Sequence, residues 1–144
     1  MKKILYLSLI LSFFILFLSC AGVTHLTADF DQEASHEAFT VTIDWATGQN
    51  VHCDFVTLYF TFKDDIVSAC RITVTYPDAE SAASVVKAWE EYSGIKNVKA
   101  KKNIVTYEYI IDTATNMSSP FSGKDSAYVI EEVERFNGVI RGQN

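Results

Sequence analysis

The side chains best able to carry chemistry are three cysteines and three histidines, and they form one dense cluster, His52-Cys53-Asp54. In a strand, alternate residues point to opposite faces, so His52 and Asp54 would share one face and Cys53 the other. Three consecutive strand residues cannot converge on one ion, and neither CxxC nor HExxH occurs in the chain. We therefore predict no metal site and interpret His52 as a polar residue at the entry to a strand.

The remaining activity motifs are missing as well. The six glycines form neither a GxGxxG phosphate loop nor a GxSxG nucleophile elbow, and no cofactor is predicted. Asp64-Asp65 lacks the surrounding oxygen ligands that calcium needs, and we interpret it as a polar turn. A catalytic Cys53 or Cys70 would need a nearby base, whose position the sequence does not give.

The N-terminus has the pattern of a secretory signal. Lys2 and Lys3 precede a predominantly apolar run, Ile4–Leu18, which is shorter than the roughly 20 residues of a membrane span. We predict a signal peptide over residues 1–19, with an uncleaved anchor helix as the alternative. Without this segment, 10 basic and 18 acidic residues remain. This acidic balance excludes nucleic acid as a partner, because phosphate binding needs clustered Lys and Arg.

The residues after the apolar run are Leu16-Phe17-Leu18-Ser19-Cys20. They resemble the bacterial lipobox, with Phe17 where leucine is commonest. The resemblance implies cleavage before Cys20, acyl chains on Cys20, and export to the bacterial cell membrane or outer membrane. Two or more acyl chains anchor a protein stably. Ordinary signal cleavage after Ala21 is the alternative, since Ser19-Cys20-Ala21 also has small residues at the required spacing.

The rest of the chain divides into a tether and one folded domain. Residues 20–38 carry four acidic side chains and no sustained apolar period, and we expect a lipidated N-terminus with an acidic, flexible tether. A short helix over residues 28–38 is the alternative. Residues 39–144 are long enough for a single domain. Its first expected strand is 39–45, which alternates apolar and polar residues.

The clearest element is a hairpin of residues 53–62 and 66–76. Centring its turn on Asp64 pairs residues whose numbers sum to 128, so Leu58 faces Cys70. Ile66 and Ser68 then share the buried, apolar face. Cys53 points to the other face, too far from Cys70 for a disulfide. We expect two free thiols, with Cys53 the more reactive.

The second half of the sequence has the patterns of helices and strands in alternation. A helix over 79–92 is capped by Asp78, strands follow at 95–99 and 104–111, and a helix begins near Ser122 and ends before Gly138. The expected fold is α+β, in the order βββ-α-ββ-α, with an antiparallel sheet of about five strands and two helices on one face. Trp89 should be buried against that face.

This order of elements resembles small bacterial lipoproteins such as the YehR group. Phe62-Lys-Asp-Asp-Ile-Val and Tyr76-Pro-Asp-Ala-Glu carry most of the resemblance. It implies a class of protein, with no catalytic residue to transfer.

The candidate binding residues lie on the threonine-rich face of the hairpin. They are Phe55, Tyr59 and Arg71, with Arg71 expected opposite Thr57, between the two aromatic rings. An aromatic pair with a central arginine could bind a sugar, a peptide or an envelope protein, or could be ordinary cross-strand packing. The one basic cluster, Lys96 to Lys102, would discourage strand-to-strand aggregation or contact anionic lipid. The sequence favours a lipid-anchored, non-enzymatic binding module, with a small envelope hydrolase as the alternative.

Overall fold

The computed structural model of the protein describes residues 22–90, 92, 94–111 and 119–144. The predicted signal peptide and Cys20 therefore lie outside the described residues. In chain order the elements are β1 (His25–Phe30), α2 (Gln32–Phe39), β2 (Val41–Asp44), β3 (Gln49–Val51), β4 (Phe55–Lys63), β5 (Ile66–Thr75), α3 (Ala79–Trp89), β6 (Ile95–Lys101), β7 (Ile104–Tyr109), α4 (Ser126–Arg135) and β8 (Val139–Gln143).

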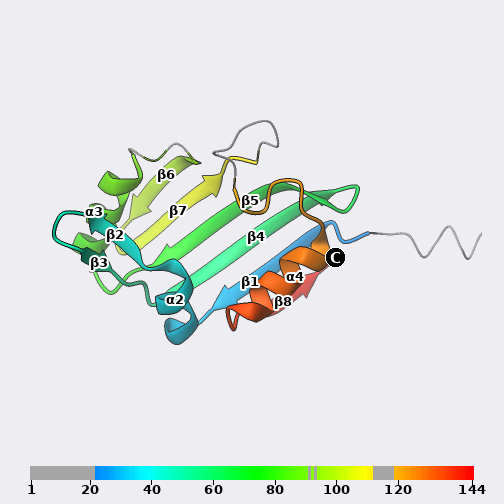
Figure 1. Ribbon diagram of the computed structural model, residues 1–144, viewed down its shortest axis with the longest axis horizontal. Coiled ribbons are helices and arrows are strands. Elements are labelled where there is room, and N and C mark those ends of the chain that lie inside the picture. The colour runs from blue at the N-terminus through cyan, green and yellow to red at the C-terminus, as the bar shows by residue number, and fades with distance from the viewer. Residues whose placement is uncertain (1–21, 91, 93, 112–118) are drawn as a thin grey trace, which may run out of the picture.

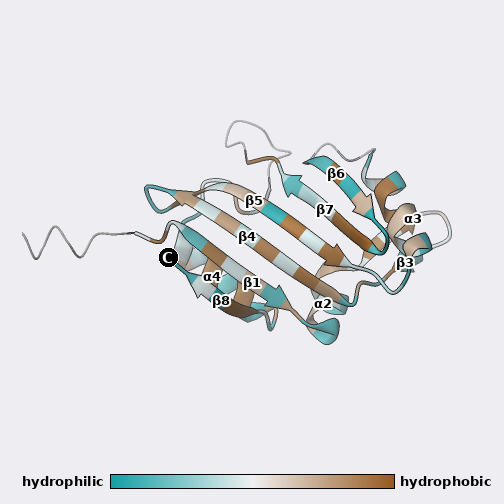
Figure 2. Ribbon diagram, turned by 180° about the vertical axis from the view of Figure 1, so that it is seen from behind, coloured by the Kyte–Doolittle hydropathy of each residue, from teal (hydrophilic) through white to brown (hydrophobic). Residues whose placement is uncertain are grey.

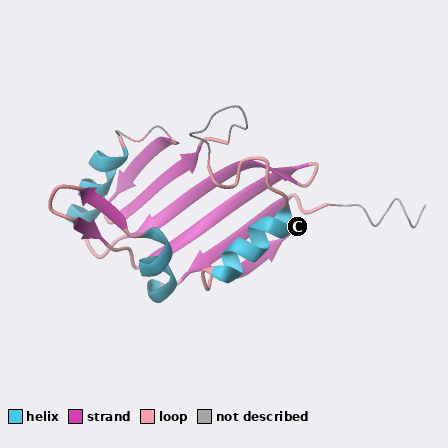
Figure 3. Ribbon diagram, viewed as in Figure 1, coloured by secondary structure: helices cyan, strands magenta, loops and turns pink. Residues whose placement is uncertain are grey.

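Six of the strands form one antiparallel sheet in the order β6-β7-β5-β4-β1-β8 (Figure 1). The strands β2 and β3 form a separate two-stranded sheet. The three helices and this small sheet lie on one face of the large sheet (Figure 3). The predicted α+β class and antiparallel sheet are confirmed, as is the placement of helices on one face. The counts differ, because one helix and two of the six strands were not expected.

The core lies between the sheet and the helices. It is built from the alternate residues of each strand that point toward the helices, together with the inward faces of the helices. Its largest fully buried side chains include Leu26, Leu58, Phe60, Ile72, Val74, Tyr76, Val85, Val105, Val129 and Val133.

The predicted tether is wrong from residue 25 onward. Residues 25–30 form β1, which lies between β4 and β8, and Leu26, Ala28 and Phe30 are buried. Residues 32–39 form α2, in agreement with the alternative of a short helix, and the Asp31 carboxylate caps it by accepting from the Ala34 N–H. The folded domain therefore begins close to Cys20.

The strand expected at 39–45 is also placed differently. Phe39 ends α2, and only Val41–Asp44 is a strand, paired with β3 and not with the large sheet. Trp45, expected on its apolar face, is 86% exposed at the β2–β3 turn. The alternating pattern indicated a strand correctly but could not indicate which strand would pair with it.

The hairpin exists, but its register differs from the predicted one by two residues. Asp64 and Asp65 both have positive φ, which is the geometry of a two-residue type I′ turn, and Lys63 pairs with Ile66. A bulge follows, and from there to the end of the hairpin the paired residue numbers sum to 130, so that Cys70 faces Phe60.

A shift of two residues preserves the faces, because side chains alternate with period two. The exceptions lie at the bulge: Ile66 and Ser68 are exposed, and Val67 is buried in their place.

Trp89 is half-buried, which is less than the sequence suggested. Its ring lies 4.8 Å from that of Tyr107, which pairs with Ile72 on the helix-covered face. Asp78 caps α3 as predicted, by accepting from the Ser81 N–H at 2.7 Å. At α4 the cap is Asp125 and not Ser122, since the Asp125 carboxylate accepts from the Tyr128 N–H.

The end of α4 is a Schellman motif with an unexpected assignment of residues. Asn137 adopts φ 58°, and its N–H donates to the Glu134 carbonyl, while the Gly138 N–H donates to the Val133 carbonyl. The left-handed residue is thus Asn137. Gly138 is required for another reason: a Cβ there would lie 2.6 Å from the Phe30 ring. From this point the chain continues into β8, an edge strand that the sequence did not indicate.

Candidate functional site

The face of the large sheet opposite the helices is uncovered among the described residues (Figure 2). We call it the open face. Cross-strand partners point to the same side of a sheet, so the register assigns its residues directly. Half-buried threonines dominate its centre: Thr27, Thr57, Thr61, Thr73, Thr75 and Thr106.

Tyr59 and Arg71 form the central contact of this face. They are direct cross-strand partners on β4 and β5, and the Arg71 guanidinium carbon lies 4.8 Å from the centre of the Tyr59 ring. This cation–π contact orients the guanidinium while leaving its donors available. Arg71 is exposed and has no ion pair or hydrogen bond from its side chain to any other described residue.

Lys96 and Glu108 face each other on the neighbouring strands β6 and β7. The Lys96 Nζ lies 3.9 Å from a Glu108 carboxylate oxygen, which also accepts from the Asn97 side-chain amide at 3.1 Å. Glu108 is the cross-strand partner of Arg71 as well. The two pairs therefore lie next to each other across four adjacent strands, β6, β7, β5 and β4.

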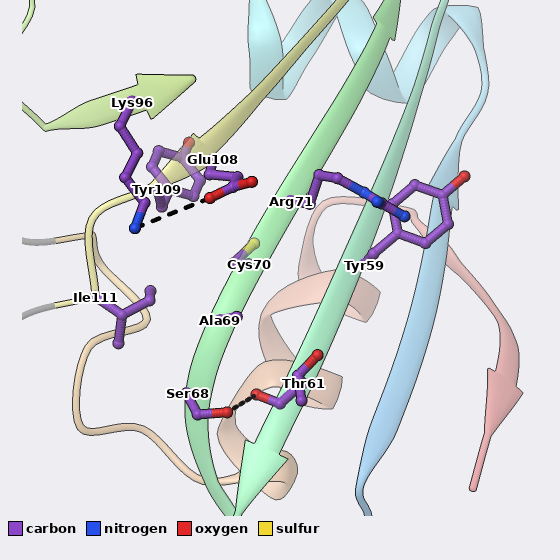
Figure 4. Close-up of a pocket in the computed structure, with 10 residues that line it drawn as sticks. All are labelled: Tyr59, Thr61, Ser68, Ala69, Cys70, Arg71, Lys96, Glu108, Tyr109 and Ile111. Atoms are coloured by element: carbon purple, nitrogen blue, oxygen red, sulfur yellow. Dashed lines mark hydrogen bonds and ion pairs between the residues drawn. The ribbon is translucent and has the colours of Figure 1, made fainter. Parts of the chain in front are cut away.

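Between these pairs is a hollow with a volume of about 350 Å³ (Figure 4). It forms where β7 diverges from β5: Arg71 and Glu108 are the last pair between these strands, and from Cys70 to Ile66 β5 is paired with β4 but not with β7. Figure 4 shows Arg71 and Tyr59 on one side of the hollow and the Lys96–Glu108 ion pair on the other. Hydroxyls of Thr61 and Ser68 line it too.

The three predicted binding residues are only partly brought together. Tyr59 and Arg71 line the hollow, but Phe55 does not; it pairs with Thr75, four residues along β4 and thus about 13 Å from Tyr59. The expected position of Arg71 opposite Thr57 is wrong, for the reason of register given above. Sequence reasoning missed Lys96 and Glu108 as neighbours of Arg71, because only the pairing of β5 with β7 brings them there.

Neither described cysteine suits nucleophilic chemistry. Both are free and buried, which confirms the expected absence of a disulfide between Cys53 and Cys70. The prediction of a reactive Cys53 is wrong: α2 covers it, its thiol lies 3.7 Å from the Ser35 carbonyl oxygen, and burial raises its pKa to about 11. Burial also raises the pKa of Cys70.

His52 follows β3 and lies on the surface beside α2. Its Nδ1 is 2.9 Å from the Thr40 hydroxyl, and its ring centre is 4.8 Å from that of His36. In the described part of the chain, no three His, Cys, Asp or Glu side chains gather closely enough to hold a metal ion.

Two further findings concern the chain as a whole. Among the described residues, no helix combines the length and apolar character needed to cross a membrane. Comparison with family models, curated proteins and solved structures finds no match. The resemblances to the lipobox and to the YehR group therefore stay predictions, and the site has to be interpreted from its own geometry.

Proposed function

We propose that this protein is a lipid-anchored, non-enzymatic binding module of the bacterial cell envelope, which holds a ligand or partner on the open face of its sheet. The observation that carries the binding role is the exposed guanidinium of Arg71, oriented by Tyr59 beside the hollow. The signal pattern of residues 1–19 and the lipobox ending in Cys20 support the anchor. Ala21 after the cysteine favours the outer membrane, if the sorting habit of such lipoproteins in two-membrane bacteria applies.

The described residues favour binding over catalysis. The polar side chains around the hollow are hydroxyls, two cations and one carboxylate already engaged by Lys96, and Ala69, Cys70 and Ile111 complete its lining. Both thiols are buried away from solvent, so they do not provide a nucleophile. The alternative of a small envelope hydrolase has no supporting contact in the described part of the chain.

The anchor is tested on the full-length chain expressed in a bacterium. We expect mass spectrometry of the membrane fraction to find a mature N-terminus at Cys20 with acyl chains. Cys20→Ala should abolish acylation and membrane retention. A mature, unlipidated N-terminus at Gly22 would reject the anchor.

The binding face is tested by labelling lysines in intact envelopes and in purified protein. Lys99 and Lys101 point to the open face, whereas Lys87 is exposed on α3. A ligand on the open face should reduce labelling of Lys99 and Lys101 in envelopes and leave Lys87 unchanged. Equal labelling at all three positions in both samples would contradict the proposed binding face.

A further inference from the structure

The open face carries a charge opposite in sign to the rest of the molecule. The chain as a whole is acidic, at −6. The carboxylates on the helices and their caps lie on the covered side: Asp31, Glu33, Glu37, Asp78, Glu80, Glu90, Asp125, Glu131, Glu132 and Glu134. The open face has six cations: the register assigns Lys63, Arg71, Lys96, Lys99 and Lys101 to it, and the ion pair with Asp29 places Arg141 there.

The two carboxylates of the open face are already neutralised. Asp29 is 6% exposed, pairs with the Arg141 guanidinium and accepts from the Thr57 hydroxyl at 2.7 Å. Glu108 is held by Lys96 and Asn97. The remaining cations, Lys63, Arg71, Lys99 and Lys101, have no carboxylate partner among the described residues. The face therefore has an excess of positive charge that attracts anions.

The surroundings of these cations are hydroxyl-rich. The six threonines of the open face and the Tyr59 phenol lie on β1, β4, β5 and β7. These strands lie between β6, which carries Lys99 and Lys101, and β8, which carries Arg141. Hydroxyls both donate and accept hydrogen bonds, so this surface matches a ligand that is itself rich in hydroxyl groups.

We propose that the open face binds an acidic polysaccharide, a chain of hydroxyl-rich sugars that carry carboxylate groups; this inference rests on the proposed function. One carboxylate would enter the hollow and accept from the Arg71 guanidinium, whose planar donors match a carboxylate. The next acidic units would follow toward Lys99 and Lys101 on β6, which lie two strands across and two to four residues along the sheet, about 12–16 Å away.

Two other acidic partners fit the face less well. Protein interfaces are enriched in aromatic side chains at their core and depleted of charge, yet the most exposed aromatic side chains, Trp45 and Tyr92, lie at the β2–β3 turn and after α3. A bilayer presents a plane of headgroups, whereas the hollow beside Arg71 is concave and accepts a discrete group.

The test uses residues 20–144 with Cys20→Ser, a soluble chain that keeps every described residue. Its binding to polygalacturonate is measured by calorimetry at low and moderate salt. We expect saturable binding that weakens as salt rises, because the contacts are between charges. Arg71→Gln should weaken binding about tenfold, in line with the loss of charge-assisted hydrogen bonds. The double change Lys99→Gln and Lys101→Gln should weaken it further, and Lys87→Gln on α3 should have no effect.

Three probes define the results that would overturn the inference. Equal binding of neutral dextran would show that charge is not recognised. Stronger binding of poly-glutamate would indicate an acidic protein partner. Binding to phosphatidylglycerol vesicles without binding to polygalacturonate would indicate the membrane surface. If no acidic sugar polymer binds while Lys99 and Lys101 are still protected in envelopes, the ligand class is wrong and the proposed binding face stands.

Discussion

Replacing Gly138 with alanine should destabilise the protein, because the added methyl group would clash with the side chains of Phe30 and Val133. An added Cβ would lie 2.6 and 2.7 Å from two carbons of the Phe30 ring and 2.9 Å from a Val133 methyl carbon. Non-bonded carbons normally approach to about 3.5–4.0 Å. The deficit is therefore about 1 Å against three atoms at once.

The neighbours of Gly138 cannot move away easily. Phe30 and Val133 are each 2% exposed, and the Phe30 ring packs edge-on against Phe39 with ring centres 5.0 Å apart. Forcing a methyl group into a packed core costs about 1–3 kcal/mol. We expect the upper half of that range, which corresponds to a fall of about 1 M in the urea midpoint for a domain of this size.

The matched control is Gly142→Ala on the same strand, β8. A Cβ at Gly142 meets nothing within 4 Å, so its free energy of unfolding should change by less than about 0.5 kcal/mol. Urea unfolding followed by tryptophan fluorescence measures both variants. Equal midpoints for the two variants would show that Phe30 yields freely, and would refute the packing of β8 and α4 against β1 described above.

Two further predictions concern ionisable groups. A thiol reagent at pH 8 should label neither Cys53 nor Cys70 until the chain is unfolded, since burial raises the pKa of Cys53 from 9.0 to about 11 and lowers its thiolate fraction about 100-fold. The free energy of unfolding should also fall as pH rises from 9 to 11, because the thiol loses its proton in the unfolded chain first, and Cys53→Ala should weaken this pH dependence. Rapid labelling of Cys53 in the native protein would contradict both the predicted protection and the predicted pH dependence. Asp78→Ala should lower the urea midpoint at neutral pH by removing the α3 cap, and hydrogen bonding from the Ser81 N–H lowers the pKa of Asp78. The cap should thus stabilise α3 fully above the pKa of the unfolded carboxyl group, and this stabilisation should be lost as pH falls through the lower pKa of the folded state. Urea titrations of wild type and Asp78→Ala from neutral to strongly acid pH measure it. A difference in the free energy of unfolding that does not change with pH would contradict this prediction.

The parts of the fold that the sequence predicted are those with a strong local period. The hairpin strands and the two longer helices were recognisable because their apolar residues repeat every two or every three to four positions. The strand β1 was missed because Asp29 places a charge in a short strand. That charge is accommodated by Arg141 and Thr57, which are distant in sequence and visible only in the folded chain.

In the candidate site, too, the local features were predictable from the sequence and the features that depend on long-range pairing were not. The face shared by Tyr59 and Arg71 follows from parity within one hairpin, but their direct pairing depends on the bulge beside Thr61. No local pattern distinguishes that bulged register from the regular one. Lys96 and Glu108 join the site through the pairing of β7 with β5, across more than thirty residues of intervening chain.

The strand at the start of the described chain is a neighbour of the strand at its end. β1 pairs with β8, and the Thr24 N–H donates to the Asn144 carbonyl. The pairing of β1 with β8 therefore joins segments more than a hundred residues apart, and closing so long a loop slows folding. A chain exported from its N-terminus would have to keep β1 extended throughout translocation. If Cys20 is lipidated as proposed, the sheet would then be completed with its first strand already tethered, since β1 begins only five residues after the lipidated cysteine.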